Sequence, residues 1–310
     1  MVHLRVVAPA AKAPQVHGLL CATASAINVI QVPGASTNPS GDLIMCDVAR
    51  EDASVIISEL RALGLQHDGS IALSATDIVS DFAVAAEKHA PGSPADAVIW
   101  EELDQRTSES VELSAVFLLY MVLASIIAAI GIFLNSPILV VGAMVVGPEF
   151  GPVAGLCVAL VQLRGSLARR SAIALAVGFP LAIAATVVAT LLFDAADLVP
   201  EAFSSDDHSL SKSISSPDAF AFIVALCAGT AGMLSLSTAK SGALIGVLIS
   251  VTTIPAAANI GIAAAYGDWD TFVGSTGQLA LNLAAILIAG TTTLYVQRLL
   301  YLRRKRRRHR

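Results

Sequence analysis

The chain has 310 residues, of which 55% are hydrophobic and only 14% are charged. Soluble globular domains carry about 45–50% apolar and about 25% charged residues, so the composition excludes a wholly soluble enzyme, a nucleic-acid-binding module and a disordered chain. The formal net charge is −5, but the charges are unevenly distributed: the basic tail RRKRRRHR holds seven of the nineteen Lys and Arg residues.

Residues 1–80 alternate short apolar stretches with helical patterns. Strands are predicted at His3–Ala8, Ile27–Val32, Asp42–Val48 and Gly69–Ser74, helices at Pro14–Ala24 and Glu51–Leu63, and a hairpin loop at Pro33–Gly41. The order βαββαβ is that of the ferredoxin-like fold, in which two helices cover one face of a four-stranded antiparallel sheet. Such a domain can bind small ligands or self-associate, and it can equally be a structural cytoplasmic cap.

Residues 81–112 are predicted to form a helical linker. A helical pattern over Asp77–Ala90 is interrupted by the sequence Pro91-Gly92-Ser93-Pro94, which is typical of a break. A second, acidic helix is predicted over Asp96–Glu112. We expect it to lead directly into the membrane, with Trp100 near the interface or against the cap.

Residues 113–300 are predicted to form a transmembrane domain, because long runs lack charged residues and a bilayer core takes about 20 apolar residues in a helix. Six spans are predicted, at about 113–133, 136–163, 171–193, 219–238, 241–266 and 278–300. Basic residues in the connections, such as Arg164 and Lys240, fall on one side, whereas the other side holds Lys212 and eight acidic residues. Because basic connections stay in the cytoplasm, both termini are predicted to be cytoplasmic.

The second and fifth spans are interrupted by proline. Pro148 and Pro152 lie within GPEFGP, and Pro255 ends VTTIP. The stretches SPILVVGAMVVGPEFGPVAG and SGALIGVLISVTTIPAAANIG can be superimposed with Gly142 over Gly246. Each is the middle span of a group of three, so the second group would insert inverted. Interrupted helices at matching places of inverted repeats indicate a transporter site near the midplane, although two apolar stretches can also resemble each other by chance.

Two segments resemble a known family. NSPILVVGAMVVGPEFGPVAGLCVAL, from Asn135 to Leu160, is similar to the signature of bacterial membrane proteins grouped as domain-of-unknown-function family 389, and Ala228–Ala263 is similar to the second motif of that family. The resemblance covers about residues 110–300. It implies a hydrophobic integral protein of the bacterial cytoplasmic (inner) membrane with an N-terminal cap, and it implies little about mechanism. Glu149 departs from the family pattern, since many members have an apolar residue there.

Glu149 is the only ionisable side chain well inside a predicted span. A carboxylate at that depth is costly and is by default a functional hypothesis, here for binding a proton or an ion. The alternative is a glutamate at a helix break that is exposed in a water-filled vestibule or hydrogen-bonded to free backbone N–H groups.

The residues around both breaks complete the candidate pathway. The prolines and Gly151 would shape unwound backbone that can hold an ion or solute, or they produce kinks alone. The neutral polar side chains are either ligands or hydrogen bonds between helices. The predicted substrate or ion pathway comprises Glu149, Pro148, Gly151, Pro152, Thr252, Thr253, Pro255 and Asn259.

Enzyme signatures such as Gly-x-Ser-x-Gly, His-Glu-x-x-His and the Walker loop are absent from the sequence, so we expect no enzyme, cofactor or metal site. The composition and the interrupted helices predict a membrane transporter or channel for a small solute or ion, with a regulatory cytoplasmic cap. The alternative is a membrane-embedded sensor or scaffold whose cytoplasmic domain binds a ligand or partner.

The basic tail at residues 301–310 follows an apolar helix directly. It is predicted to bind anionic lipid at the cytoplasmic surface, although a tail of this charge can also be a nucleic-acid patch. The glycine-rich second span favours close helix packing. We therefore expect the bilayer, anionic lipid, a small solute or ion and further copies of the chain as partners, and no nucleic acid.

Overall fold

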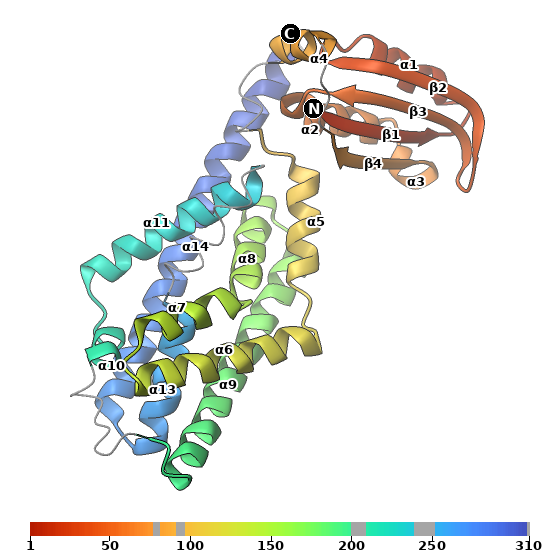
Figure 1. Ribbon diagram of the computed structural model, residues 1–310. Helices are drawn as coiled ribbons and strands as arrows, with labels where there is room; N and C mark the ends of the chain where they lie inside the picture. Colours follow the sequence, from red (N-terminus) through yellow and green to blue (C-terminus); the bar gives the residue numbers. More distant parts are fainter. Residues whose placement is uncertain (77–80, 91–96, 200–208, 239–251, 309–310) are drawn as a thin grey trace. The chain divides into compact units, whose positions relative to one another are not determined.

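The computed structural model describes residues 1–76, 81–90, 97–199, 209–238 and 252–308 (Figure 1). The chain divides into two compact units. The first is built from Met1–Leu103 together with the end of the chain from Leu300, and the second from Asp104–Leu236 together with residues up to Leu299.

The first unit contains a small antiparallel sheet. Its strands are β1 (Val2–Ala8), β2 (Ala26–Thr37), β3 (Ser40–Val48) and β4 (Ser70–Ala75), in the order β2-β3-β1-β4. The central strand β1 pairs antiparallel with both neighbours, and its Val6 lies opposite Ile44 of β3 and Ile71 of β4.

Helices α1 (Ala13–Cys21) and α2 (Arg50–Ala62) pack against one face of this sheet. Alternate residues of a strand point to the same face, so Leu4, Val6 and Ala8 enter one core with Leu20 of α1 and Ile56 of α2. A short helix, α3 (Leu65–Asp68), follows α2. It begins after Gly64, which has a left-handed backbone conformation with φ of 78°.

The predicted loop at Pro33–Gly41 is wrong, because most of it belongs to the β2–β3 hairpin. The register of β2 shifts between Val32 and Ser36, and such a bulge accommodates proline and glycine in an edge strand. Asp42 of β3 holds the bulged segment, since its carboxylate accepts hydrogen bonds from the Gly34 backbone N–H at 2.9 Å and from the Gln31 amide at 2.8 Å. The turn itself is confined to Asn38 and Pro39.

The linker forms helices α4 (Asp81–His89) and α5 (Trp100–Ser110). The prediction of a helix running from Asp96 into the membrane is wrong at its end. The chain leaves the helix after Ser110, and α6 (Ala115–Phe133) begins anew behind Ser114, whose hydroxyl accepts from the Phe117 N–H at 3.1 Å. Trp100 packs in the first unit, where its backbone N–H donates to the Ser54 hydroxyl at 3.0 Å.

The second unit is helical. After α6 it contains α7 (Pro137–Val146), α8 (Phe150–Gln162), α9 (Gly165–Ala195), α10 (Ser209–Ile214), α11 (Ala219–Ser237), α13 (Thr253–Tyr266) and α14 (Trp269–Arg308). Among the described residues, four helices are long and apolar enough to cross a membrane, or five if the bent pair α7–α8 is one span. These helices indicate a multi-pass membrane protein.

Two predicted spans are shorter than the helices that contain them. Helix α9 begins at Gly165 and α14 begins at Trp269 and continues to Arg308, because hydropathy marks only the part of a helix that suits hydrocarbon. The fifth predicted span, 241–266, lies partly outside the described residues. Its described part is α13, which is apolar but has only 14 residues.

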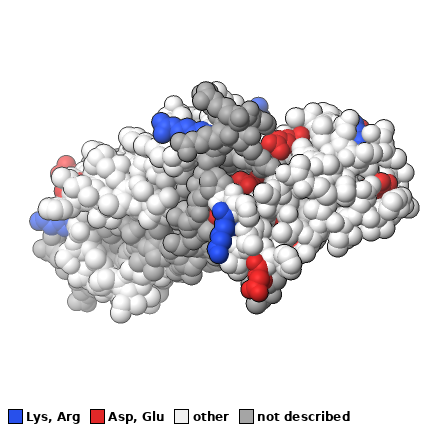
Figure 2. Space-filling model, turned by 90° about the horizontal axis from the view of Figure 1, so that it is seen from above, with Lys and Arg blue, Asp and Glu red and all other residues white. Residues whose placement is uncertain are grey.

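Many small residues lie in the interior of the second unit, and many large apolar residues lie on its outside. Ala256, Ala257 and Ala258 are fully buried, whereas Ile138 and Phe220 are 82% and 77% exposed. The unit therefore presents large apolar side chains on its exterior, as a lipid environment requires. Seen from above in Figure 2, the molecule shows scattered Lys, Arg, Asp and Glu side chains on a visible surface made mostly of other residues.

Candidate functional site

The break predicted in the second span lies between α7 and α8, whose axes differ by 52°. Helix α7 ends at Val146, and α8 begins at Phe150 with Glu149 as its N-cap residue. Pro152 is the third residue of α8. Backbone N–H groups in the first turn have no partner within the helix, so proline is tolerated there and helps to start the second half-helix.

Helix α13 begins in the same way. Its N-cap residue is Thr252, Thr253 is the first helical residue, and Pro255 is the third. The helix starts thus pair Glu149 with Thr252 and Pro152 with Pro255. This register differs by one residue from the superposition that places Gly142 over Gly246.

The two helix starts are joined through one carboxylate. The hydroxyl of Thr253 donates a hydrogen bond to Glu149 Oε1 at 2.6 Å. Glu149 is only 5% exposed, and its Oε2 has no hydrogen-bond partner among the described residues. The carboxylate is therefore buried against a helix start and does not lie exposed in a vestibule.

The space for this carboxylate depends on Gly147. A Cβ atom at residue 147 would lie 2.4 Å from Glu149 Oε2 and 2.7 Å from Ile254 Cγ1. Since real side chains do not approach so closely, any larger residue would displace Glu149, Ile254 or both. Glycine at this position is thus a steric requirement of the site.

The N-termini of α8 and α13 place partial positive charges near the Glu149 carboxylate. Each N-terminus carries a partial positive charge from the aligned peptide dipoles, and Glu149 lies at the start of α8 while it accepts from the first residue of α13. Among the described residues, no basic side chain forms an ion pair with Glu149. The dipoles favour a negative charge here, and burial opposes it.

A cavity of about 410 Å³ reaches the α7–α8 break. Gly147, Pro148 and Gly151 line it together with residues from α5 to α6, from α8 and from α11, among them Arg106 and Glu109. Gly151 also packs closely on α5, since a Cβ atom there would lie 2.9 Å from the Ser110 carbonyl oxygen. A small ligand in this cavity would contact the backbone beside Glu149.

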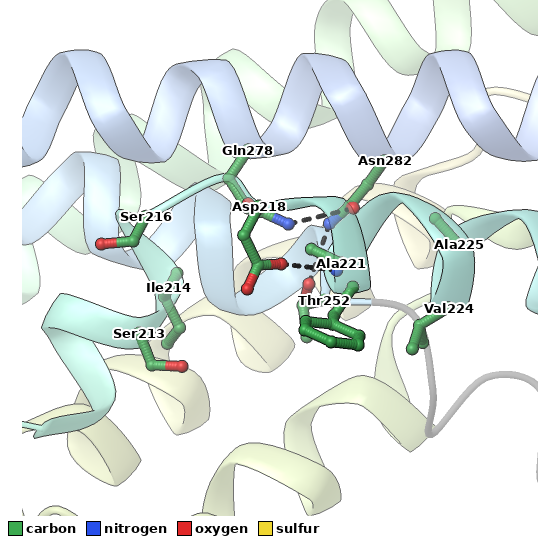
Figure 3. Close-up of a pocket in the computed structure, with 11 residues that line it drawn as sticks. Ser213, Ile214, Ser216, Asp218, Ala221, Val224, Ala225, Thr252, Gln278 and Asn282 are labelled. Atoms are coloured by element: carbon green, nitrogen blue, oxygen red, sulfur yellow. Dashed lines mark hydrogen bonds between the residues drawn. The ribbon is translucent and has the colours of Figure 1, made fainter.

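A second cavity, of about 280 Å³, reaches Thr252 (Figure 3). Asn282 Nδ2 donates to Thr252 Oγ1 at 2.8 Å, and Gln278 Nε2 donates to Asn282 Oδ1 at 3.1 Å. Gln278 and Asp218 line this cavity and were not predicted as site residues. The available signal for Gln278 was its position four residues before Asn282 in an apolar run, which places both amides on one helix face.

Asn259 belongs to a different cluster. Its amide nitrogen donates to the Ser211 carbonyl at 3.1 Å and to the Ser275 hydroxyl at 2.9 Å, and its oxygen accepts from the Ser211 hydroxyl at 2.9 Å. It lies six residues after Thr253, about 9 Å further along the helix. The structure therefore brings Glu149 and Thr253 together and places Asn259 in a network that ties α13 to α10 and α14.

Comparison with known proteins relates part of the second unit to a known family. Residues 144–288 match the family model described as Domain of unknown function (DUF389). An uncharacterized protein of Methanocaldococcus jannaschii, MJ0678, is 27% identical over 202 residues, which cover 62% of this chain and 58% of the relative. The aligned part thus spans less than two thirds of the relative's length. No solved structure matches the chain significantly. Residues 144–288, which include both helix starts, are a domain of the DUF389 family.

Proposed function

We propose that this chain is a membrane transporter or channel for a small solute or ion, with its site at the interrupted helices and the first unit as a regulatory cap. The observation that carries the proposal is the buried Glu149 carboxylate, which is held at Oε1 by Thr253 and has no described partner at Oε2. A buried acidic group with one available oxygen is suited to exchange a proton or a cation.

The equivalent helix starts support an architecture of two inverted repeats. The first would comprise α6, α7–α8 and α9, and the second α11, a span ending in α13, and α14. Both middle members have a proline at the third residue of the half-helix, and such paired breaks favour a site at the repeat interface. The strand order β2-β3-β1-β4 similarly supports a ferredoxin-like first unit.

Each of the two cavities is lined by a residue that adjoins this pair in the chain. One is lined by Gly147 and Pro148, which precede Glu149, and the other by Thr252, which precedes Thr253. A ligand could therefore approach the hydrogen-bonded pair from either cavity. Rupture of the Thr253–Glu149 hydrogen bond would be the local event that lets it pass.

The remaining parts of the proposal concern setting and assembly. We place the protein in a bacterial inner membrane with both termini in the cytoplasm, because basic connections favour that side. The tail would contact anionic lipid at about 1 kcal/mol per basic residue near the surface. Close helix packing favours a homo-oligomer, which light scattering in mild detergent would measure. No enzyme chemistry, cofactor or nucleic acid is part of the proposal.

The experiment is flux into liposomes that contain the purified full-length chain and a trapped pH-sensitive dye. With opposed proton and potassium gradients, the wild type should dissipate the pH gradient faster than empty liposomes, and Glu149→Gln should lose this pH-dependent flux while folding normally. Asp270→Asn, which removes an exposed carboxylate at the start of α14, is the matched control. Equal flux from wild type and Glu149→Gln would eliminate the proposed role of Glu149.

A further inference from the structure

The cavity at Thr252 is lined by both polar and apolar side chains (Figure 3). The polar side chains come from the segment before α11, from Thr252 and from α14, and they are Ser213, Ser216, Asp218, Thr252, Gln278 and Asn282. The apolar side chains come from the end of α10 and the first two turns of α11, including Ile214, Phe220 and Val224. A lining of both kinds suits a small organic molecule with one polar end.

The hydrogen bonds among the polar side chains leave one buried acceptor without a donor. Gln278 donates to Asn282, and Asn282 in turn donates to Thr252, so each amide in this row uses its nitrogen for the next residue. Gln278 Oε1 remains at its beginning, in a residue that is 3% exposed, without a partner among the described residues. A buried acceptor without a donor is unfavourable, and Gln278 is one of the residues that line the cavity.

Asp218 determines the charge of this site. Its Oδ1 accepts from the Ala221 N–H at 2.6 Å and thereby caps α11, while its side chain lines the same cavity as Gln278. The described lining contains no Lys or Arg. Reversing both amides would replace Gln278 Oε1 by the amide nitrogen, which is a donor. In the structure the orientation of the row leaves an acceptor on Gln278, at a cavity that the Asp218 carboxylate also lines.

We propose that this cavity binds a small organic cation, a protonated primary amine, in which the ammonium group donates to Gln278 Oε1 and Asp218. An ammonium group has three donors and no acceptor, which matches the available groups. Its carbon chain would lie against the apolar side chains of the lining, such as Ile214 and Val224. The volume of about 280 Å³ accommodates a small molecule of this kind. Such a ligand can bind whether or not the chain transports it.

The first test is equilibrium binding to the purified full-length protein in mild detergent. The probe is n-butylammonium chloride, followed by calorimetry at constant ionic strength, with n-butanol, butyrate and potassium chloride as controls of matched shape or charge. We expect saturable binding of butylammonium only. Three results would overturn the proposal. Preference for butyrate would show that the amides have the opposite orientation, and equal binding of potassium would assign the site to inorganic cations. Absence of butylammonium binding would show that the cavity is not an amine site.

The second test uses variants that separate the site from general surface charge. Asp218→Asn keeps an N-cap residue that helices favour and removes the charge, so butylammonium affinity should fall about tenfold or more, as expected for a lost hydrogen bond to a charged group. Asp270→Asn should leave the affinity unchanged. Gln278→Glu adds a second carboxylate and should strengthen binding.

Unchanged affinity in Asp218→Asn, or an equal loss in Asp270→Asn, would contradict the assignment. Because these measurements involve no flux, their failure is distinct from a failure of the transport experiment.

Discussion

Glu149 and Thr253 are 104 residues apart in the sequence, yet the hydroxyl of one donates to the carboxylate of the other at 2.6 Å in the interior of the second unit. The contact joins the starts of two half-helices. Oε2 of Glu149 has no partner among the described residues. The Thr253 hydroxyl is therefore the described side chain that satisfies this carboxylate, and substitutions of Thr253 test its contribution.

Replacing Thr253 by valine should destabilise the protein. The change preserves shape but removes the donor to a buried carboxylate, and leaving such a group unsatisfied costs about 1–3 kcal/mol. Thermal unfolding in detergent should show a lower Tm for Thr253→Val, whereas Thr253→Ser, which keeps the hydroxyl, should remain near the wild type. If the valine and serine variants have the same Tm, the hydrogen bond makes no measurable contribution to stability.

Gly147→Ala should disturb the site, whereas the same change at Gly142 on α7 should not. The new methyl group would meet Glu149 Oε2 and Ile254, whereas a Cβ atom at Gly142 would meet nothing within 4 Å. We expect Gly147→Ala to reduce flux in liposomes and Gly142→Ala to leave it unchanged. Similar flux in both variants would mean that the carboxylate adapts freely.

Close packing of α13 against α9 depends on Gly261. A Cβ atom there would lie 2.6 Å from Thr186 Cβ and 2.9 Å from the Ile183 carbonyl oxygen. Because the backbone cannot give way as a flexible side chain does, Gly261→Ala should cost about 1–3 kcal/mol through overpacking. Gly277→Ala, whose nearest neighbour would be 3.8 Å away, is the control. Equal unfolding temperatures for the two variants would argue against this interface.

The predicted orientation can be tested with single cysteines at two exposed positions. In a background with Cys21 and Cys227 replaced by serine, a cysteine at Asp270 should react with an impermeant thiol reagent added to intact cells. A cysteine at Ser166 should react only after the membrane is opened, since basic connections stay inside. Labelling at position 166 in intact cells would show that the predicted orientation is wrong.

The cysteines of the first unit should differ strongly in reactivity. Burial, with a further contribution from Asp47, raises the pKa of the Cys46 thiol to about 12, and only the thiolate is nucleophilic. At pH 8, far below that pKa, Cys46 should stay unmodified while the exposed Cys21 is alkylated. Mass spectrometry of the alkylated protein would measure both, and rapid modification of Cys46 would indicate that the sheet opens.

The sequence predicted the elements whose signal is local and missed the contacts that are not. Charge-free runs and prolines were sufficient to predict long apolar helices and the break beside Pro148, because both follow from solvation and backbone chemistry within one segment. The extension of β2 past Pro33 depends on Asp42 in the next strand. The partners of Glu149 and Gln278 similarly depend on how distant helices pack, and periodicity carries no information about that.

The inward placement of small side chains has a consequence for handling the protein. In lipid there is no water to expel from between two helices, so their association depends on dispersion contacts that are lost steeply when the surfaces separate. Each of the buried residues Ala256, Ala257 and Ala258 contributes only a small contact area. Short detergent tails can therefore enter between helices that are held together by such contacts. Tail length of the detergent should therefore govern how long the purified protein survives, much more than the salt concentration does.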